Sequence, residues 1–204
     1  MRRTEEIQTP RGPARVDLDL PEGDPASLLV LGHGAGGDVD APDLVALRDA
    51  AVAAGVGVVR VTQPYRVAGR RAPAPAGQLD EAWSAVVGAV RQRHPAGPAL
   101  VVGGRSSGAR VACRTAVALG AAGVVALAFP LHPPGRPERS RADELATGLP
   151  TLVVNGDRDP FGVPAPGPGV RVETRPGERH DLRRDPAGTA AVAVAWLRER
   201  GWAR

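Results

Sequence analysis

Serine, aspartate and histidine residues follow separate apolar segments of this 204-residue chain. Ser106 lies in Gly104-Arg105-Ser106-Ser107-Gly108, which fits G-x-S-x-G, after the apolar segment 99–102 and before an alanine-rich helical pattern. This motif places a serine in a sharp strand-to-helix turn, with glycines where side chains would collide. The pattern predicts a nucleophilic serine, and a helix-capping serine in a plain glycine-rich turn is the alternative.

The partners that such a serine needs occur further along the chain. Asp157 and Asp159 follow the apolar segment 151–154, and Asp159 directly precedes a proline, where G-x-x-D hydrolase motifs have their acid. We therefore predict that Asp159 is the acid and that Asp157 caps or braces the turn. His180 follows both, so it is the predicted base, because the chain order Ser…Asp…His is then complete.

The remaining histidines fit other roles. His94 ends a helical pattern, where a solvated imidazole is expected. His33 lies in a glycine-rich loop and is expected to hydrogen-bond that loop in place. His132 follows the apolar segment 123–128 and is expected to line a pocket.

The glycine-rich loop has the sequence LGHGAGG and follows the apolar segment 27–31. It matches the H-G-x-G type of loop, which supplies a backbone N–H to an oxyanion hole. We expect the donors at Gly34 or Ala35 and at Ser107, the residue after the proposed nucleophile.

The same loop also fits the dinucleotide fingerprint G-x-G-x-x-G. That fingerprint should open a helix at once, but residues 38–42 intervene. The next strand should end in an acid that binds the ribose, and Arg60 and Thr62 stand there instead. A dinucleotide-binding module is therefore kept only as an alternative.

The elements that must position these residues are short, β-branched apolar runs separated by helical patterns. Runs without polar alternation suit strands buried on both faces, so we predict a three-layer α/β fold with a mostly parallel sheet and helices on both faces. The predicted strands are 15–20 at an edge, then 27–31, 56–61, 99–102, 123–128, 151–154 and 170–173. The predicted helices are 43–54, 78–93, 107–119, 138–147 and 187–200. Parallel strands bring their carboxyl ends together, so the motif residues should meet at one edge of the sheet.

Composition excludes several other classes of protein. All 26 basic residues are arginine, but acids are interspersed among them and aromatics make up only 3%, so no nucleic-acid partner is expected. One cysteine excludes an internal disulfide framework and a cysteine-based zinc site. No stretch approaches 18 apolar residues, so we expect no membrane span. The amino terminus starts basic without an apolar run behind it, so we expect no secretory signal and a cytoplasmic location.

With these motifs the chain resembles the α/β-hydrolase superfamily, in its small, lid-less dienelactone-hydrolase-like branch. LGHGAGG, GGRSSGARVA, FPLHPPG, NGDRDPFG and the late His180 are similar, more narrowly, to the testis-expressed/KANL-type α/β-hydrolase-like family. The resemblance covers roughly residues 15–200 and implies one domain over residues 1–204 without a large cap. It also implies a nucleophile at Ser106, a base at His180 and an acid at Asp159.

The sequence thus predicts a serine hydrolase that cleaves a small carboxylic ester or thioester through an acyl-enzyme, without a cofactor or metal. The expected partner is a small acyl substrate in a shallow pocket, with lining candidates His33, Tyr65, Arg66, Arg105 and His132. The arginines, with Arg70 and Arg71, either attract an anionic acyl group or are ordinary solvated side chains. A non-catalytic scaffold of the same fold that binds a partner protein is the other alternative.

Overall fold

The computed structural model describes residues 2–93 and 99–204 of the chain. His94, predicted as a solvated residue at a helix end, lies outside the described residues. No helix in the described part is long and apolar enough to cross a membrane.

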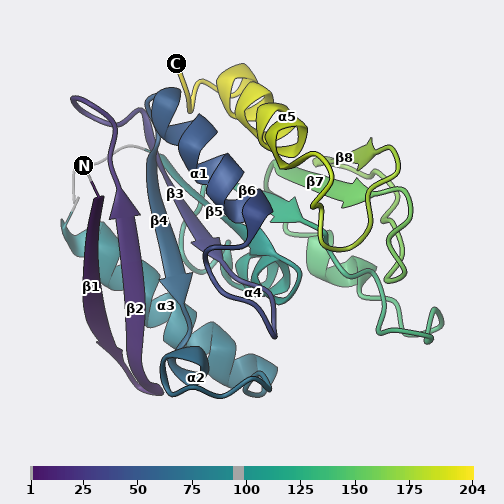
Figure 1. Ribbon diagram of the computed structural model, residues 1–204, viewed down its shortest axis with the longest axis horizontal. Coiled ribbons are helices and arrows are strands. Elements are labelled where there is room, and N and C mark those ends of the chain that lie inside the picture. The colour runs from purple at the N-terminus through teal and green to yellow at the C-terminus, as the bar shows by residue number, and fades with distance from the viewer. Residues whose placement is uncertain (1, 94–98) are drawn as a thin grey trace.

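The centre of the fold is a sheet with the strand order β1-β2-β4-β3-β5-β6-β7-β8 (Figure 1). The strands are β1 (Arg2–Thr9), β2 (Gly12–Asp19), β3 (Ser27–Gly32), β4 (Gly57–Thr62), β5 (Ala99–Arg105), β6 (Gly123–Leu127), β7 (Thr151–Gly156) and β8 (Val170–Arg175). β2 is antiparallel to β1 and to β4, and the strands from β4 across to β8 are parallel. β3, β4, β6 and β7 are buried along their whole length, as their continuous apolar sequences predict.

Helices cover both faces of this sheet, which confirms the predicted three-layer α/β class. α1 and α5 lie together over one face, and α3 and α4 lie over the other (Figure 1). The helical segments are α1 (Pro42–Ala53), α2 (Pro64–Val67), α3 (Ala76–Arg93), α4 (Ser107–Thr115), the 3₁₀ turn η1 (Ala142–Leu145) and α5 (Pro186–Glu199).

Each face of the sheet has its own apolar core. Leu44 and Leu47 of α1 and Trp196 of α5 are buried against one face. Trp83 and Val86 of α3 are buried against the other. These cores fix the strand ends, and the loops at the carboxyl edge are built on that rigid support.

Several predicted elements need correction. Segment 15–20 is not an edge strand, because β2 pairs with β4 on one side and with β1 on the other. The sequence does not predict β1, since RRTEEIQT is charged and, among residues 3–9, Ile7 alone is buried. The helix predicted over 138–147 is reduced to η1, and the helix predicted to reach residue 119 ends at Thr115 and continues as turns to Gly120, which has a φ of 62°. The loop after β4 contains the unpredicted helix α2.

Candidate active site

Ser106 stands between the end of β5 and the start of α4, in a backbone conformation that is unusual for a residue with a side chain. Its φ is 53° and its ψ is −110°. The turn is tight because a Cβ on Gly104 would lie 2.4 Å, and one on Gly108 2.3 Å, from the carbonyl oxygen of Gly32 at the end of β3. The two glycines therefore let β3 and α4 approach each other around the serine, as a nucleophile elbow requires.

His180 lies between Ser106 and Asp159. Its Nε2 is 2.9 Å from Ser106 Oγ, and its Nδ1 is 2.8 Å from Asp159 Oδ2. An ionised carboxylate only accepts hydrogen bonds, so the imidazole donates from Nδ1 and Nε2 is left to accept from the serine hydroxyl. The structure thus brings together the three residues that the sequence singled out, from the ends of β5 and β7 and the loop after β8.

Asp159 is held by groups that sequence reasoning missed. The N–H of Phe161 donates to its Oδ1 at 2.8 Å, and Asn155 Nδ2 lies 3.4 Å from its Oδ2. Asn155 is fully buried and also bonds both backbone groups of Phe129 and the carbonyl of Gly162. A polar residue at the end of an otherwise apolar strand is the signal that would have found it.

Asp157, the competing acid, is directed elsewhere. It is exposed, and its Oδ1 accepts a hydrogen bond from the N–H of Gly177 at 2.7 Å. Asp157 therefore braces the turn that follows β8, while Asp159 is the aspartate in contact with His180.

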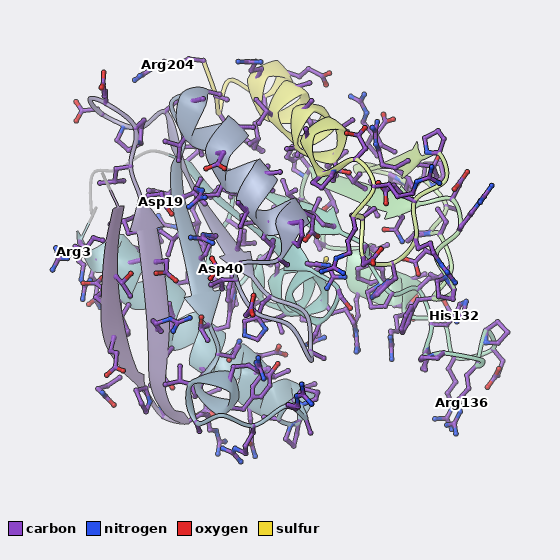
Figure 2. The ribbon with its side chains drawn as sticks, in the orientation of Figure 1. Arg3, Asp19, Asp40, His132, Arg136 and Arg204 are labelled. Atoms are coloured by element: carbon purple, nitrogen blue, oxygen red, sulfur yellow. The ribbon has the colours of Figure 1, made fainter. Side chains whose placement is uncertain are left out.

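Phe161 forms one wall beside His180. The two rings stack with their centroids 4.0 Å apart and an interplanar angle of 29°. His132, a predicted pocket residue, donates its N–H to the carbonyl of Phe161, and its Nδ1 lies 2.9 Å from the carbonyl of Pro133. Figure 2 shows His132 on the loop that projects from the molecule with Arg136. The projecting loop is thus joined to the segment that carries Phe161 through a backbone hydrogen bond at His132.

The glycine-rich loop after β3 is fixed through its carbonyl groups. His33 Nδ1 donates to the carbonyl of Gly34 at 2.7 Å, and the Tyr65 hydroxyl donates to the carbonyl of Ala35 at 2.6 Å. Among the described residues, none accepts a hydrogen bond from the N–H of Gly34 or Ala35. A Cβ on Gly34 would lie 3.6 Å from the Cβ of Ser106, so these free donors are close to the serine.

His33 and Tyr65 support this loop from below. His33 Nε2 accepts the N–H of Gln63, and burial lowers the pKa of its imidazole. Burial likewise raises the pKa of Tyr65 to about 12. Together they line a void of about 10 Å³, which has room for one water molecule and not for a substrate. Arg66 lies on α2 and donates to the carbonyl of Arg70.

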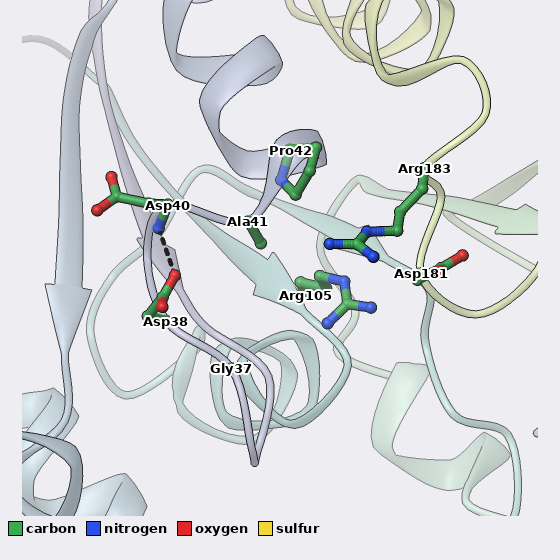
Figure 3. A pocket seen from close by; sticks show the side chains of 8 residues that line it. All are labelled: Gly37, Asp38, Asp40, Ala41, Pro42, Arg105, Asp181 and Arg183. Atoms are coloured by element: carbon green, nitrogen blue, oxygen red, sulfur yellow. Dashed lines mark hydrogen bonds between the residues drawn. The ribbon is translucent and has the colours of Figure 1, made fainter. Parts of the chain in front are cut away.

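Arg105, the residue before Ser106, lines a cavity of about 410 Å³ together with Asp181, the residue after His180 (Figure 3). Arg105 Nε lies 3.2 Å from Asp43 Oδ2, and its Nη2 donates to the carbonyl of His180 at 3.1 Å. Burial of Asp43 raises the pKa of its carboxyl to about 6, although Arg105 opposes this. The cavity wall consists of Gly37, Asp38, Asp40, Ala41, Pro42, Arg105, Asp181 and Arg183.

The end of β4 has an arginine at the position where a dinucleotide site would have its acid. Arg60 is fully buried, and its Nη1 donates to the carbonyl of Val39 and to Asp40. Arg60, at the position predicted for the ribose acid, therefore binds the segment that follows the glycine-rich loop. α1 begins only at Pro42, so its N-terminus does not open directly from the glycines.

The eight-stranded sheet with helices on both faces is the fold of the α/β hydrolases. Residues 25–167 match the family described as Alpha/beta hydrolase domain, and the chain belongs to this family. A search of the curated proteins gave no match.

Solved structures of similar fold span nearly the whole chain. The lid-less α/β serine hydrolase XC6422 from Xanthomonas campestris is 22% identical, with a TM-score of 0.79 over 98% of this chain and 94% of that one. The dienelactone hydrolase from Anabaena variabilis is 15% identical, with a TM-score of 0.77 over 100% and 99%. The esterase domain of a Rhodothermus marinus protein is 15% identical, with a TM-score of 0.73 over 98% of each chain. Like XC6422, this chain has no large cap domain in its described part.

Proposed function

We propose that this chain is a serine hydrolase that cleaves small carboxylic esters or thioesters. The observation that carries the proposal is the continuous hydrogen-bond chain from Ser106 Oγ through the His180 imidazole to Asp159, with distances of 2.9 and 2.8 Å. The family and the esterase and dienelactone hydrolase among its structural neighbours support the same reaction class.

The reaction proceeds through an acyl-enzyme. His180 Nε2 takes the proton of Ser106 as Oγ attacks the carbonyl carbon, and the N–H groups of Ala35 or Gly34 and of Ser107 hold the oxyanion. The intermediate expels the alkoxide or thiolate, which receives the proton from His180. Water then attacks the acyl group with His180 as base, releasing a carboxylic acid and restoring the serine.

Each remaining part of the site has a role in this scheme. Asp159 keeps the imidazole in the tautomer that accepts at Nε2 and stabilises its cationic form. The α4 N-terminus points at the reacting serine, which favours the developing negative charge. The proposal includes a cytoplasmic location, a single domain over 1–204, a small-molecule acyl substrate, and membership of the narrower testis-expressed/KANL-type family, which the motifs LGHGAGG and GGRSSGARVA support.

Labelling with a fluorophosphonate probe tests the proposal. We expect wild type and Ser107→Ala to label, because the control keeps its backbone N–H, and Ser106→Ala to remain unlabelled. Equal labelling of Ser106→Ala and wild type, or no labelling of any variant, would contradict it. The second outcome favours a non-catalytic scaffold that binds a partner protein.

A steady-state assay then assigns the base and the substrate. With a panel of short-chain aryl esters and thioesters, His180→Ala should abolish turnover, whereas His132→Ala should only alter it. The reversed pattern would move the base to His132.

A further inference from the structure

Arg105 connects four segments that build the site. It precedes Ser106 in the elbow, its Nε pairs with Asp43 at 3.2 Å, and its Nη2 donates to the carbonyl of His180 at 3.1 Å. Its Nη1 lies 3.0 Å from the point where a Cβ on Gly34 would stand, so it packs against the glycine-rich loop. Each guanidinium nitrogen therefore faces a different segment.

Asp43 holds this guanidinium from a rigid side. It lies in the first turn of α1, and its side chain is fully buried, with an exposed fraction of 0%. Burying a carboxylate is costly unless a partner compensates its charge, and Arg105 supplies that partner. α1 is fixed on the sheet through Leu44 and Leu47, so the ion pair is anchored in the core.

His180 lies on a loop, so its position depends on contacts with other segments. It lies in the segment between Arg175, at the end of β8, and Pro186, at the start of α5, outside any helix or strand. Arg105 donates to the backbone carbonyl of His180, so it fixes the backbone position from which the imidazole side chain extends. A planar guanidinium can meet a carboxylate and a carbonyl in two directions at once, which the single ammonium of a lysine does poorly.

We propose that Arg105, held by Asp43, is a positioning residue that fixes His180 and the Gly34 loop relative to Ser106. It acts through these groups and needs no contact with substrate. The proposal rests on the proposed hydrolase function. Loss of the Arg105 side chain should lower kcat, because the imidazole moves away from the serine proton, and should leave KM nearly unchanged.

The test compares Arg105→Met with Arg91→Met, a matched control at an exposed arginine of α3 whose Nη1 also donates to backbone carbonyls, those of Leu119 and Gly120. With an aryl ester, Arg105→Met should lower kcat by about 10- to 100-fold, since misplacements near 1 Å have effects of that order. Arg91→Met should match wild type, because Arg91 contacts no residue of the site. Equal kcat values for the two variants would overturn the proposal.

A double variant separates positioning from stability. Arg105→Met leaves the Asp43 carboxylate buried without its partner, which lowers the midpoint of urea unfolding. Arg105→Met/Asp43→Leu replaces the pair with apolar side chains and should recover that midpoint while kcat stays low. Recovery of kcat together with the midpoint would mean that the pair is merely structural.

A second readout does not depend on turnover. The Nδ1 proton of His180, bonded to Asp159, should give a far-downfield proton resonance, assigned by its loss in His180→Gln. It should broaden or vanish in Arg105→Met and in the double variant, and persist in Arg91→Met. Persistence of this resonance in Arg105→Met would overturn the proposal for Arg105, whether or not wild type labels with the fluorophosphonate. Failure of wild type to label would count against the proposed function alone.

Discussion

Gly108 lies where α4 meets the end of β3, and its replacement by alanine should damage both stability and activity. The added Cβ would stand 2.3 Å from the carbonyl oxygen and 2.4 Å from the carbonyl carbon of Gly32, and 2.9 Å from the carbonyl oxygen of His33. Ordinary contacts of a Cβ begin at 3.4 Å, so the helix must move away by about 1 Å. All three atoms belong to the backbone and cannot rotate aside.

This movement should cost about 1–3 kcal/mol of unfolding free energy, as overpacking of a core does. It also shifts the Ser107 N–H relative to the glycine-rich loop, and a displacement of about 1 Å is worth roughly 100-fold in kcat/KM. Urea unfolding followed by tryptophan fluorescence and hydrolysis of an aryl ester measure the two effects.

Gly88→Ala in the interior of α3 is the matched control, because a Cβ there has nothing within 4 Å. It should stabilise the chain by up to about 1 kcal/mol and leave activity unchanged. If Gly108→Ala does not fold, Gly34→Ala tests the same reasoning. Its Cβ would come closer than an ordinary contact only to the end of the flexible Arg105 side chain, at 3.0 Å, and would lie 3.6 Å from Ser106 Cβ, so stability should hold while activity falls. Wild-type stability and activity in Gly108→Ala would refute the argument.

Four further substitutions test the surroundings of the site. Asp159→Asn should lower kcat by about 10⁴-fold, because the imidazole would adopt the wrong tautomer, and steady-state kinetics measures this loss. Asp157→Asn should keep kcat and lower the unfolding free energy by about 1 kcal/mol for one lost hydrogen bond, measured by urea unfolding. The pKa of Asp43 is raised from 3.8 to about 6, so the folded state binds its proton more tightly and stability falls as pH rises through this range. The unfolding free energy of Asp43→Asn, relative to that of wild type, should therefore rise by about 2 kcal/mol between about pH 4 and pH 7, measured by unfolding at each pH. A difference that stays constant with pH would contradict the raised pKa of Asp43. Asn155→Ala leaves both backbone groups of Phe129 unpaired and should cost about 1–3 kcal/mol while lowering kcat; unchanged values of both would exclude a supporting role.

The sequence predicts the central strands well because each is a continuous apolar run, and a parallel sheet needs little else to specify its buried strands. β1 escapes prediction because an edge strand is held by backbone pairing, so its side chains can be charged. The chain order Ser…Asp…His pointed to Ser106, Asp159 and His180, which the structure brings into contact.

The supporting residues of the site could not be predicted in the same way. Phe161, Asn155 and Asp43 belong to no short motif, and their contacts with the site exist only once separate segments have packed together. Tyr65 was predicted beside a pocket, but its hydroxyl is turned to the carbonyl of Ala35. Such orientations depend on tertiary packing, which spacing along the chain does not encode.

The backbone of Ser106, with φ at 53° and ψ at −110°, sets stability and the proposed activity against each other at one position. A non-glycine residue in such a conformation costs of order 1–3 kcal/mol, and a glycine would relieve most of it. The chain with glycine at position 106 should thus be the more stable protein and unable to form an acyl-enzyme. The fold thus holds the hydroxyl of the proposed nucleophile on a strained backbone, and substitutions chosen for stability alone would favour its removal.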